Sequence, residues 1–102
     1  MPEKINPHFG AEIQKLRLQQ NLPLRKVAAV LDIDTSTLSK IEKGERQVQL
    51  RMLPAISKLF RLDFKALQID FLSDKLVSDL GDQEFFLESM ELAIKKIKNK
   101  QK

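Results

Sequence analysis

The sequence predicts an all-α fold, a five-helix domain whose fifth helix is extended and is followed by an added C-terminal helix. Three observations predict it. Apolar residues recur three or four positions apart along most of the chain, which is the spacing of one face of an α-helix. Residues that start or stop helices separate these segments. The length of 102 residues suits one domain with a modest helical core.

The composition and the distribution of charge narrow the class of protein. There is no cysteine, which excludes a disulfide framework and zinc sites built from thiolates. No apolar run approaches the roughly 20 residues of a membrane span, so we expect a soluble, cytoplasmic protein without membrane contact. The net charge is +4; residues 1–62 hold eleven Lys and Arg against six Asp and Glu, whereas residues 63–91 hold two against eight. The positive field therefore belongs to the first part of the chain.

The first helix is predicted to begin at Asn6 and Pro7 and to run to about Asn21. Asn is a helix-capping residue, and proline at the first helical position loses nothing through its missing N–H group. The inward face carries apolar residues at helical spacing, namely Phe9, Ile13 and Leu16.

A second helix over residues 24–31 is predicted to follow directly, opened by Pro23. Its inner face is formed by Val27, Ala28 and Leu31, and the small side chain of Ala28 suits a place where two helices cross closely. Asp32 and Ile33 leave room only for a tight turn before the next helix. Two short helices joined by such a turn form the helix-turn-helix arrangement.

The third helix, residues 35–43, has a clear inner and outer side. Asp34 can accept hydrogen bonds from the free amides of the first turn, and Gly44 can adopt the left-handed conformation that ends the helix. Leu38 and Ile41 lie three apart and are expected to face the core. The residues left on the outer side are small, polar or positive: Thr35, Ser36, Ser39, Lys40 and Lys43.

The later helices are less sharply bounded. Pro54 would delete a hydrogen bond inside a helix, so the fourth helix is expected to begin near Met52 or Leu53. Asp63 is a suitable cap for the fifth helix, in which Phe64 and Leu67 should pack back on the core. That helix should continue to residue 80, where Gly81 ends it; Asp82 should then cap a last helix over residues 83–98.

Residues 9–62 resemble the lambda repressor-like (Cro/repressor, Xre-type) helix-turn-helix family. The most specific part of the match is the run 38–44, in register with the second helix. The other matching residues are Leu16, Arg17, Val27, Ala28, Ile33, Leu53, Ile56 and Leu59. The resemblance implies a DNA-binding domain over residues 1–67, and we expect the helical extension 68–102 to serve dimerisation.

The resemblance also implies roles for individual residues. Base-reading positions in the major groove would be Thr35, Ser36 and Lys40, whose hydroxyl and ammonium groups can bond base edges. Phosphate contacts would fall to Arg25, Lys26, Thr37, Ser39, Lys43, Arg46 and Gln47. Arg17 and Glu42 would form a partly buried structural pair. For Thr35 and Ser36 a competing interpretation remains, because both residue types favour helix starts without any ligand.

Three positions depart from the usual family pattern. Members usually carry a hydroxyl residue and then a phosphate-gripping Gln at the start of the second helix, where this chain has Pro23 and Leu24. The contact from that helix is therefore expected from Arg25 or Lys26, or from backbone amides. Glycine is usual in the turn at the place of Asp32, which would have to adopt a left-handed conformation.

Apolar residues in the last two helices exceed what a small core can cover. Those expected at an interface are Phe71, Leu76, Leu80, Phe86, Met90, Ile94 and Ile97. Either the two helices fold back on each other as a hairpin or they meet a second copy, and exposed apolar stripes of this size favour a homodimer. No polar groups converge there, so no cofactor is expected, and a single histidine offers no metal site.

Two functions follow from these features. The first is a sequence-specific transcriptional regulator, such as a repressor, that binds an inverted repeat in double-stranded DNA as a homodimer. The alternative is a protein-interaction module or antitoxin-type partner that uses the C-terminal helices to hold a second protein, such as a toxin or a polymerase subunit. An enzyme is not expected, because the sequence has no carboxylate pair, glycine-rich phosphate loop or metal-ligand spacing.

Overall fold

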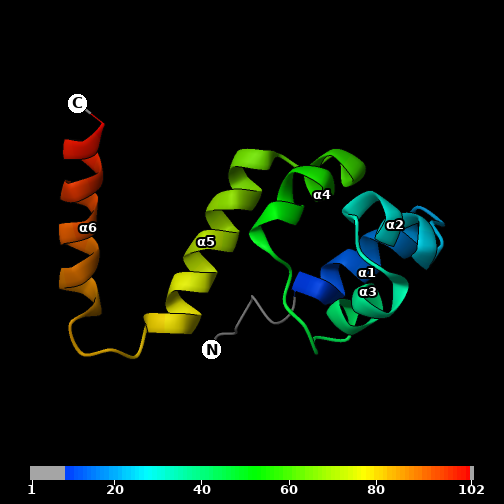
Figure 1. Ribbon diagram of the computed structural model, residues 1–102, viewed down its shortest axis with the longest axis horizontal. Coiled ribbons are helices and arrows are strands. Elements are labelled where there is room, and N and C mark those ends of the chain that lie inside the picture. Colours follow the sequence, from blue (N-terminus) through cyan, green and yellow to red (C-terminus); the bar gives the residue numbers. More distant parts are fainter. Residues whose placement is uncertain (1–8, 102) are drawn as a thin grey trace.

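The computed structural model describes residues 9–101, which form six α-helices and one short 3-10 helix (Figure 1). The elements are α1 (Phe9–Gln19), α2 (Leu24–Leu31), α3 (Thr35–Glu42), η2 (Leu50–Met52), α4 (Leu53–Phe60), α5 (Phe64–Leu80) and α6 (Phe86–Lys100). The predicted all-α fold is confirmed for this part of the chain. The predicted helix start at Asn6 and Pro7 lies outside the described residues.

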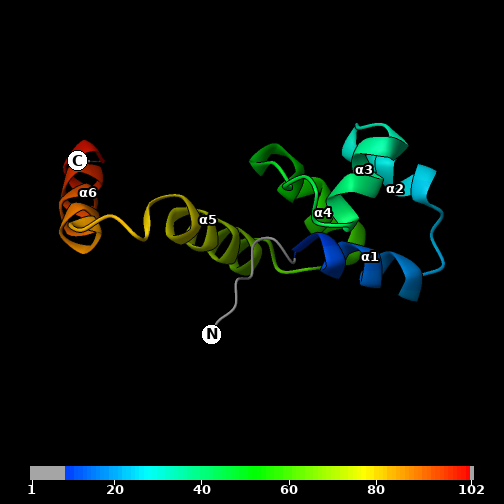
Figure 2. The same cartoon turned by 90° about the horizontal axis from the view of Figure 1, so that it is seen from below.

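Helices α1 to α4 gather into one body, and α5 leads away from it towards α6 (Figures 1 and 2). The core of this body takes residues from every helix of the body and from the first half of α5. The buried apolar residues are Ile13, Val27, Ala28, Leu31, Leu38, Ile41, Val48, Met52, Leu53, Ile56, Phe60, Leu67 and Phe71. Burying a large side chain of this kind contributes about 1.5 to 3 kcal/mol, so this cluster is what holds the short helices in place.

Helices α1, α2 and α4 are each followed by a residue in the left-handed conformation and then by an apolar residue. The left-handed residues are Asn21, Asp32 and Arg61, with φ of 54°, 59° and 56°, and the apolar residues that follow them and pack on the core are Leu22, Ile33 and Leu62. After α2, the N–H of Ile33 donates to the carbonyl of Ala28 at 3.0 Å. Such bonds satisfy carbonyls that the helix end leaves free. The left-handed conformation expected of Asp32 is confirmed.

Some predicted helix boundaries and packing positions differ from the structure. α4 begins at Leu53 as expected, with Pro54 in its first turn where no amide is needed. Phe64 was expected in the core but is 40% exposed at the start of α5, although its spacing places it on the same side as Leu67 and Phe71. Gly81 does follow the last residue of α5.

The start of α6 was predicted wrongly. The helix begins at Phe86, and Phe85 rather than Asp82 occupies the position before it. Residues 81–85 form turns instead, in which the N–H of Gln83 donates to the carbonyl of Leu80 at 3.0 Å and the N–H of Phe86 donates to the carbonyl of Gln83 at 3.2 Å. The Asp82 carboxylate accepts a bond from the neighbouring Gln83 side chain and caps no helix.

Helix α6 stands apart from the body in both views, beyond the end of α5 (Figures 1 and 2). It buries none of its residues. Leu76, Leu80, Ile94 and Ile97 are exposed, as an interface would need, whereas Phe71 is only 6% exposed. Phe71 therefore belongs to the core, and its expected place in the dimerisation surface is corrected. None of the helices within residues 9–101 is both long and apolar enough to cross a membrane.

Candidate nucleic-acid interface

Helix α3 is anchored on one side and open on the other. Leu38 is fully buried and Ile41 is 1% exposed, so both point into the core between α1 and α2. The residues on the opposite arc are exposed, apart from Ser39, which is partly buried: Thr35, Ser36, Ser39, Lys40 and Lys43. This arc carries two positive charges and no carboxylate. The inward and outward sides of α3 thus agree with the sequence prediction.

The start of α3 is fixed by Asp34. Its carboxylate accepts a bond from the backbone N–H of Thr37 at 2.7 Å and another from the hydroxyl of Ser36 at 3.0 Å. The bond from the Thr37 N–H is the main reason that the pKa of Asp34 lies below its ordinary value, with the Ser36 hydroxyl and the charge of Arg46 adding to it. In this arrangement the Ser36 hydroxyl donates to the cap, so its oxygen remains free only to accept a bond from a base.

The end of α3 is fixed by Gly44, whose φ of 82° favours glycine. Its N–H donates to the carbonyl of Ile41 at 3.0 Å, and the N–H of Glu45 donates to the carbonyl of Lys40 at 2.8 Å. These two bonds make a Schellman motif and turn the chain sharply out of the helix. The loop that follows exposes Arg46 and Gln47 and is tied down by the buried Val48.

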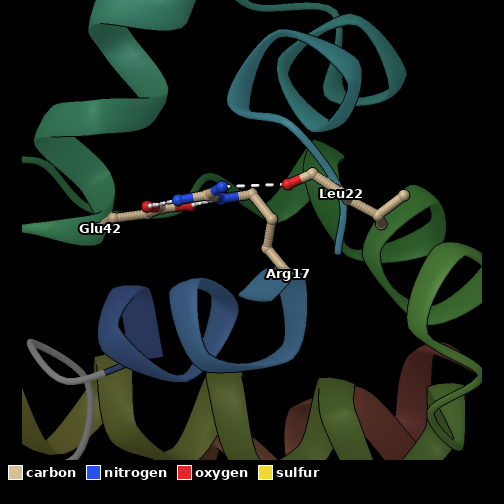
Figure 3. A network of polar contacts seen from close by, with 3 residues as sticks. All are labelled: Arg17, Leu22 and Glu42. Carbon is tan, nitrogen blue, oxygen red and sulfur yellow. Dashed lines mark hydrogen bonds and ion pairs between the residues drawn. The ribbon is translucent and has the colours of Figure 1, made fainter. Parts of the chain in front are cut away.

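An ion pair connects α1 to the last turn of α3 (Figure 3). Arg17 Nε donates to Glu42 Oε2 at 2.8 Å and Nη2 donates to Oε1 at 3.0 Å, while Nη1 donates to the carbonyl of Leu22 at 3.0 Å. The side chains are 12% and 3% exposed. Hydrogen bonding to Glu42 raises the pKa of Arg17, so this guanidinium stays charged. The predicted structural pair is present and fixes where the helix end lies.

Sequence reasoning missed a second contact between α1 and α3. A Cβ atom at Gly10 would lie 1.8 Å from the carbonyl oxygen of Ile41 and 2.7 Å from its carbonyl carbon. Only glycine lets the two backbones approach this closely. A signal was present, since glycine inside a helix costs about 1 kcal/mol relative to alanine and needs a packing reason.

The residues expected to contact phosphate fall into two groups. Those that are exposed are Arg25, Lys26, Lys43, Arg46 and Gln47, whereas Thr37 and Ser39 are partly buried. Arg25 and Lys26 lie in the first turn of α2. Pro23 precedes that turn and offers no side-chain hydrogen bond to it, as expected from the missing hydroxyl. The first-turn amides of Leu24 and Arg25 have no partner within the helix.

This arrangement is suited to binding an anionic polymer. It presents hydroxyl, amide and cationic groups on exposed parts of α2, α3 and the loop after α3. Within residues 9–101 no three His, Cys, Asp or Glu side chains are grouped so that they could hold a metal ion.

Comparison with protein families gives a match to a helix-turn-helix family. The family model described as helix-turn-helix matches residues 13–67, which is more than half of the chain. The matched region begins inside α1, spans α2, α3 and α4, and ends in α5. No curated protein and no solved structure matches the chain significantly.

Proposed function

Because the chain belongs to the lambda repressor-like, Xre-type helix-turn-helix family of DNA-binding regulators, we propose that it binds an inverted-repeat operator in double-stranded DNA as a homodimer. In this proposal α3 enters the major groove, with Thr35, Ser36 and Lys40 at the base edges. Residues 1–67 supply the DNA-binding domain and residues 68–102 supply the dimer contacts, with Phe71 left to the core.

The observation that carries the proposal is the two-sided packing of α3. Leu38 and Ile41 anchor the helix while Lys40 projects into solvent from an arc free of carboxylates. Lys40 can reach the acceptor atoms of guanine, and the exposed Thr35 hydroxyl can either donate to or accept from a base. Lys43, just after the last turn of α3, and Arg46, in the loop that follows, would contact the phosphates.

The proposal can be tested by selecting bound oligonucleotides from a random pool and then measuring binding to the selected site. Lys40→Ala should weaken binding by about 1 to 3 kcal/mol and relax the preference at one base pair of each half-site. Lys58→Ala is the matched control, because Lys58 is exposed on α4 and lies outside α2, α3 and the loop after it. Equal affinities for Lys40→Ala and Lys58→Ala, or binding without any sequence preference, would refute base reading by Lys40.

A phosphate contact has a different signature. Lys43→Ala should weaken binding to all sequences alike and reduce the slope of log affinity against log salt by about 1. The selected sites should be inverted repeats with half-sites about 34 Å apart, because a two-fold dimer places its recognition helices on successive major grooves. Single half-sites selected without a repeat would contradict the dimer.

The second candidate function uses the C-terminal helices to hold a different protein, such as a toxin or a polymerase subunit. It is favoured by apolar side chains that stay exposed in the single chain, above all Leu87 at 75% and Val77 at 64%. A monomer in sedimentation of the purified chain, together with a stoichiometric complex formed with another protein, would decide for this candidate.

A further inference from the structure

Helix α5 is apolar on two opposite sides. Leu67 and Phe71 face the core. The outer stripe, defined as Ile69, Leu72, Leu76 and Leu80, lies about half a turn away from them. Its members are exposed by 56%, 39%, 36% and 46%, and Leu72, Leu76 and Leu80 line a shallow hollow together with Lys75 and Asp79. One side of α5 is thus covered by its own domain and the other is open.

Helix α6 carries an apolar stripe of the same length. The α6 stripe is defined as Phe86, Met90, Ile94 and Ile97, and no residue of α6 is buried. Read backwards from Leu80, the outer stripe of α5 has steps of four, four and three residues. Read forwards from Phe86, the α6 stripe has the same steps. The two stripes are therefore complementary when the helices run antiparallel, and out of step when they run parallel.

We propose that the outer stripe of α5 binds the α6 stripe of a second copy of this chain, so that two chains exchange their last helices. In this register Leu80 meets Phe86, Leu76 meets Met90, Leu72 meets Ile94 and Ile69 meets Ile97 of the other copy. Each chain provides one receptor and one inserted helix, which closes a two-fold symmetric dimer. The inference rests on the homodimer of the proposed function and specifies how it is built.

One pair of opposite charges agrees with the antiparallel orientation. Asp70 lies beside the outer stripe of α5, and Lys98 lies beside the end of the α6 stripe. The antiparallel register, in which Ile69 meets Ile97, brings Lys98 level with Asp70.

The second copy is a better occupant than the chain's own α6. Residues 81–85 are folded into turns that hold α6 beyond the end of α5, and the two helices stand apart in both views (Figures 1 and 2). The α6 stripe, whose spacing matches the outer stripe of α5, lies in the same polypeptide. If the outer stripe bound an unrelated protein, no such match within the chain would be needed. Exchange also buries both pairs of stripes at once.

Disulfide trapping tests the exchange, because the sequence contains no cysteine. One chain carries Leu76→Cys, and a second chain of different length, extended by a tag, carries Met90→Cys. After mixing, unfolding, refolding and mild oxidation without DNA, a covalent heterodimer should form, since facing helices bring Cβ atoms within disulfide reach. Glu88→Cys, on the opposite side of α6, is the matched partner that should give little or none.

The outcomes separate the possible occupants. A single chain carrying Leu76→Cys and Met90→Cys together should give covalent dimers; a bond confined within one chain would show a hairpin and overturn the proposal. No bond in either design, with a monomer in sedimentation, would assign the stripe to another protein and also overturn it. As a second measurement, Leu76→Glu should sediment as a monomer with unchanged helical circular dichroism.

The disulfide-trapping result does not depend on sequence-specific DNA binding. Lys40→Ala should trap as efficiently as the parent chains, because Lys40 lies on α3 and not on either stripe. Failure of sequence-specific binding with intact trapping would count against the proposed function alone. Failure of trapping with intact sequence-specific binding would count against the exchange alone.

Discussion

Replacing either member of the Arg17–Glu42 pair should destabilise the domain far more than replacing both. Arg17→Met would leave the Glu42 carboxylate, 3% exposed, without the two donors that now bind it. Glu42→Leu would leave the Arg17 guanidinium with only the Leu22 carbonyl as a partner. The double replacement removes both charges and fills their space with apolar atoms.

The burial of the two groups sets the size of each effect. Stranding one charge of a buried pair costs about 3 to 5 kcal/mol. Arg17 is 12% exposed and can be partly hydrated, so Glu42→Leu should lower the free energy of unfolding by about 2 kcal/mol. Arg17→Met should lower it by about 3 kcal/mol or more, because the Glu42 side chain is only 3% exposed. The double variant should lie within about 1 to 2 kcal/mol of the parent, since apolar replacement of a buried pair is often neutral. The implied coupling is about 3 kcal/mol.

Urea unfolding of the four proteins at one protein concentration and neutral pH measures this cycle. The exposed Lys75–Asp79 pair, at 3.5 Å with side chains 47% and 52% exposed, provides the control. Asp79→Asn should change the free energy of unfolding by less than about 0.5 kcal/mol. The reasoning fails if the Arg17 and Glu42 effects simply add, or if Arg17→Met costs no more than Asp79→Asn.

Two further results should follow. Gly10→Ala should lower the free energy of unfolding by about 1 to 2 kcal/mol, because displacing the Ile41 carbonyl outweighs the roughly 1 kcal/mol by which alanine favours the helix; a more stable variant in urea unfolding would disprove the close approach. The Asp34 cap should be sensitive to acid. Its pKa is lowered in the folded state, so its contribution is present above the ordinary value of 3.8 and is lost as pH falls through the lower folded value. Asp34→Asn keeps a hydrogen-bond acceptor but cannot titrate. The difference in free energy of unfolding between this variant and the parent should therefore be present at neutral pH and should change as acid removes the charge of Asp34. A difference that does not change with pH would contradict this prediction.

The sequence was sufficient for the features that depend on local pattern. The spacing of Leu38 and Ile41 predicts which side of α3 is buried, and Asp34 and Gly44 predict its ends, because caps and periodicity act within a few residues of each other. The Arg17–Glu42 pair was also placed, although its partners are 25 positions apart. That placement came from resemblance to a family, since nothing local connects the two residues.

What escaped prediction depends on distant backbone or on competition between local signals. The closeness of Gly10 to Ile41 is a property of how α1 crosses α3, which no short window contains. At the start of α6, Asp82 is a residue type that can cap a helix, but residues 81–85 form turns, so the helix begins four residues later, at Phe86. Phe71 is an exception, because it stands four residues after Leu67 and its spacing alone already places it on the core side of α5, where the structure buries it.

The double character of α5 links the two proposed surfaces. It runs without a break from Phe64 to Leu80, about 25 Å at 1.5 Å per residue. Phe71 locks one side of this rod into the domain that carries α3, and Leu72, its direct neighbour, belongs to the outer stripe on the other side. A flexible linker would let two recognition helices take many separations. A continuous helix that is packed on both faces allows few such separations. In an exchanged dimer the geometry of α5 would therefore set the spacing between half-sites.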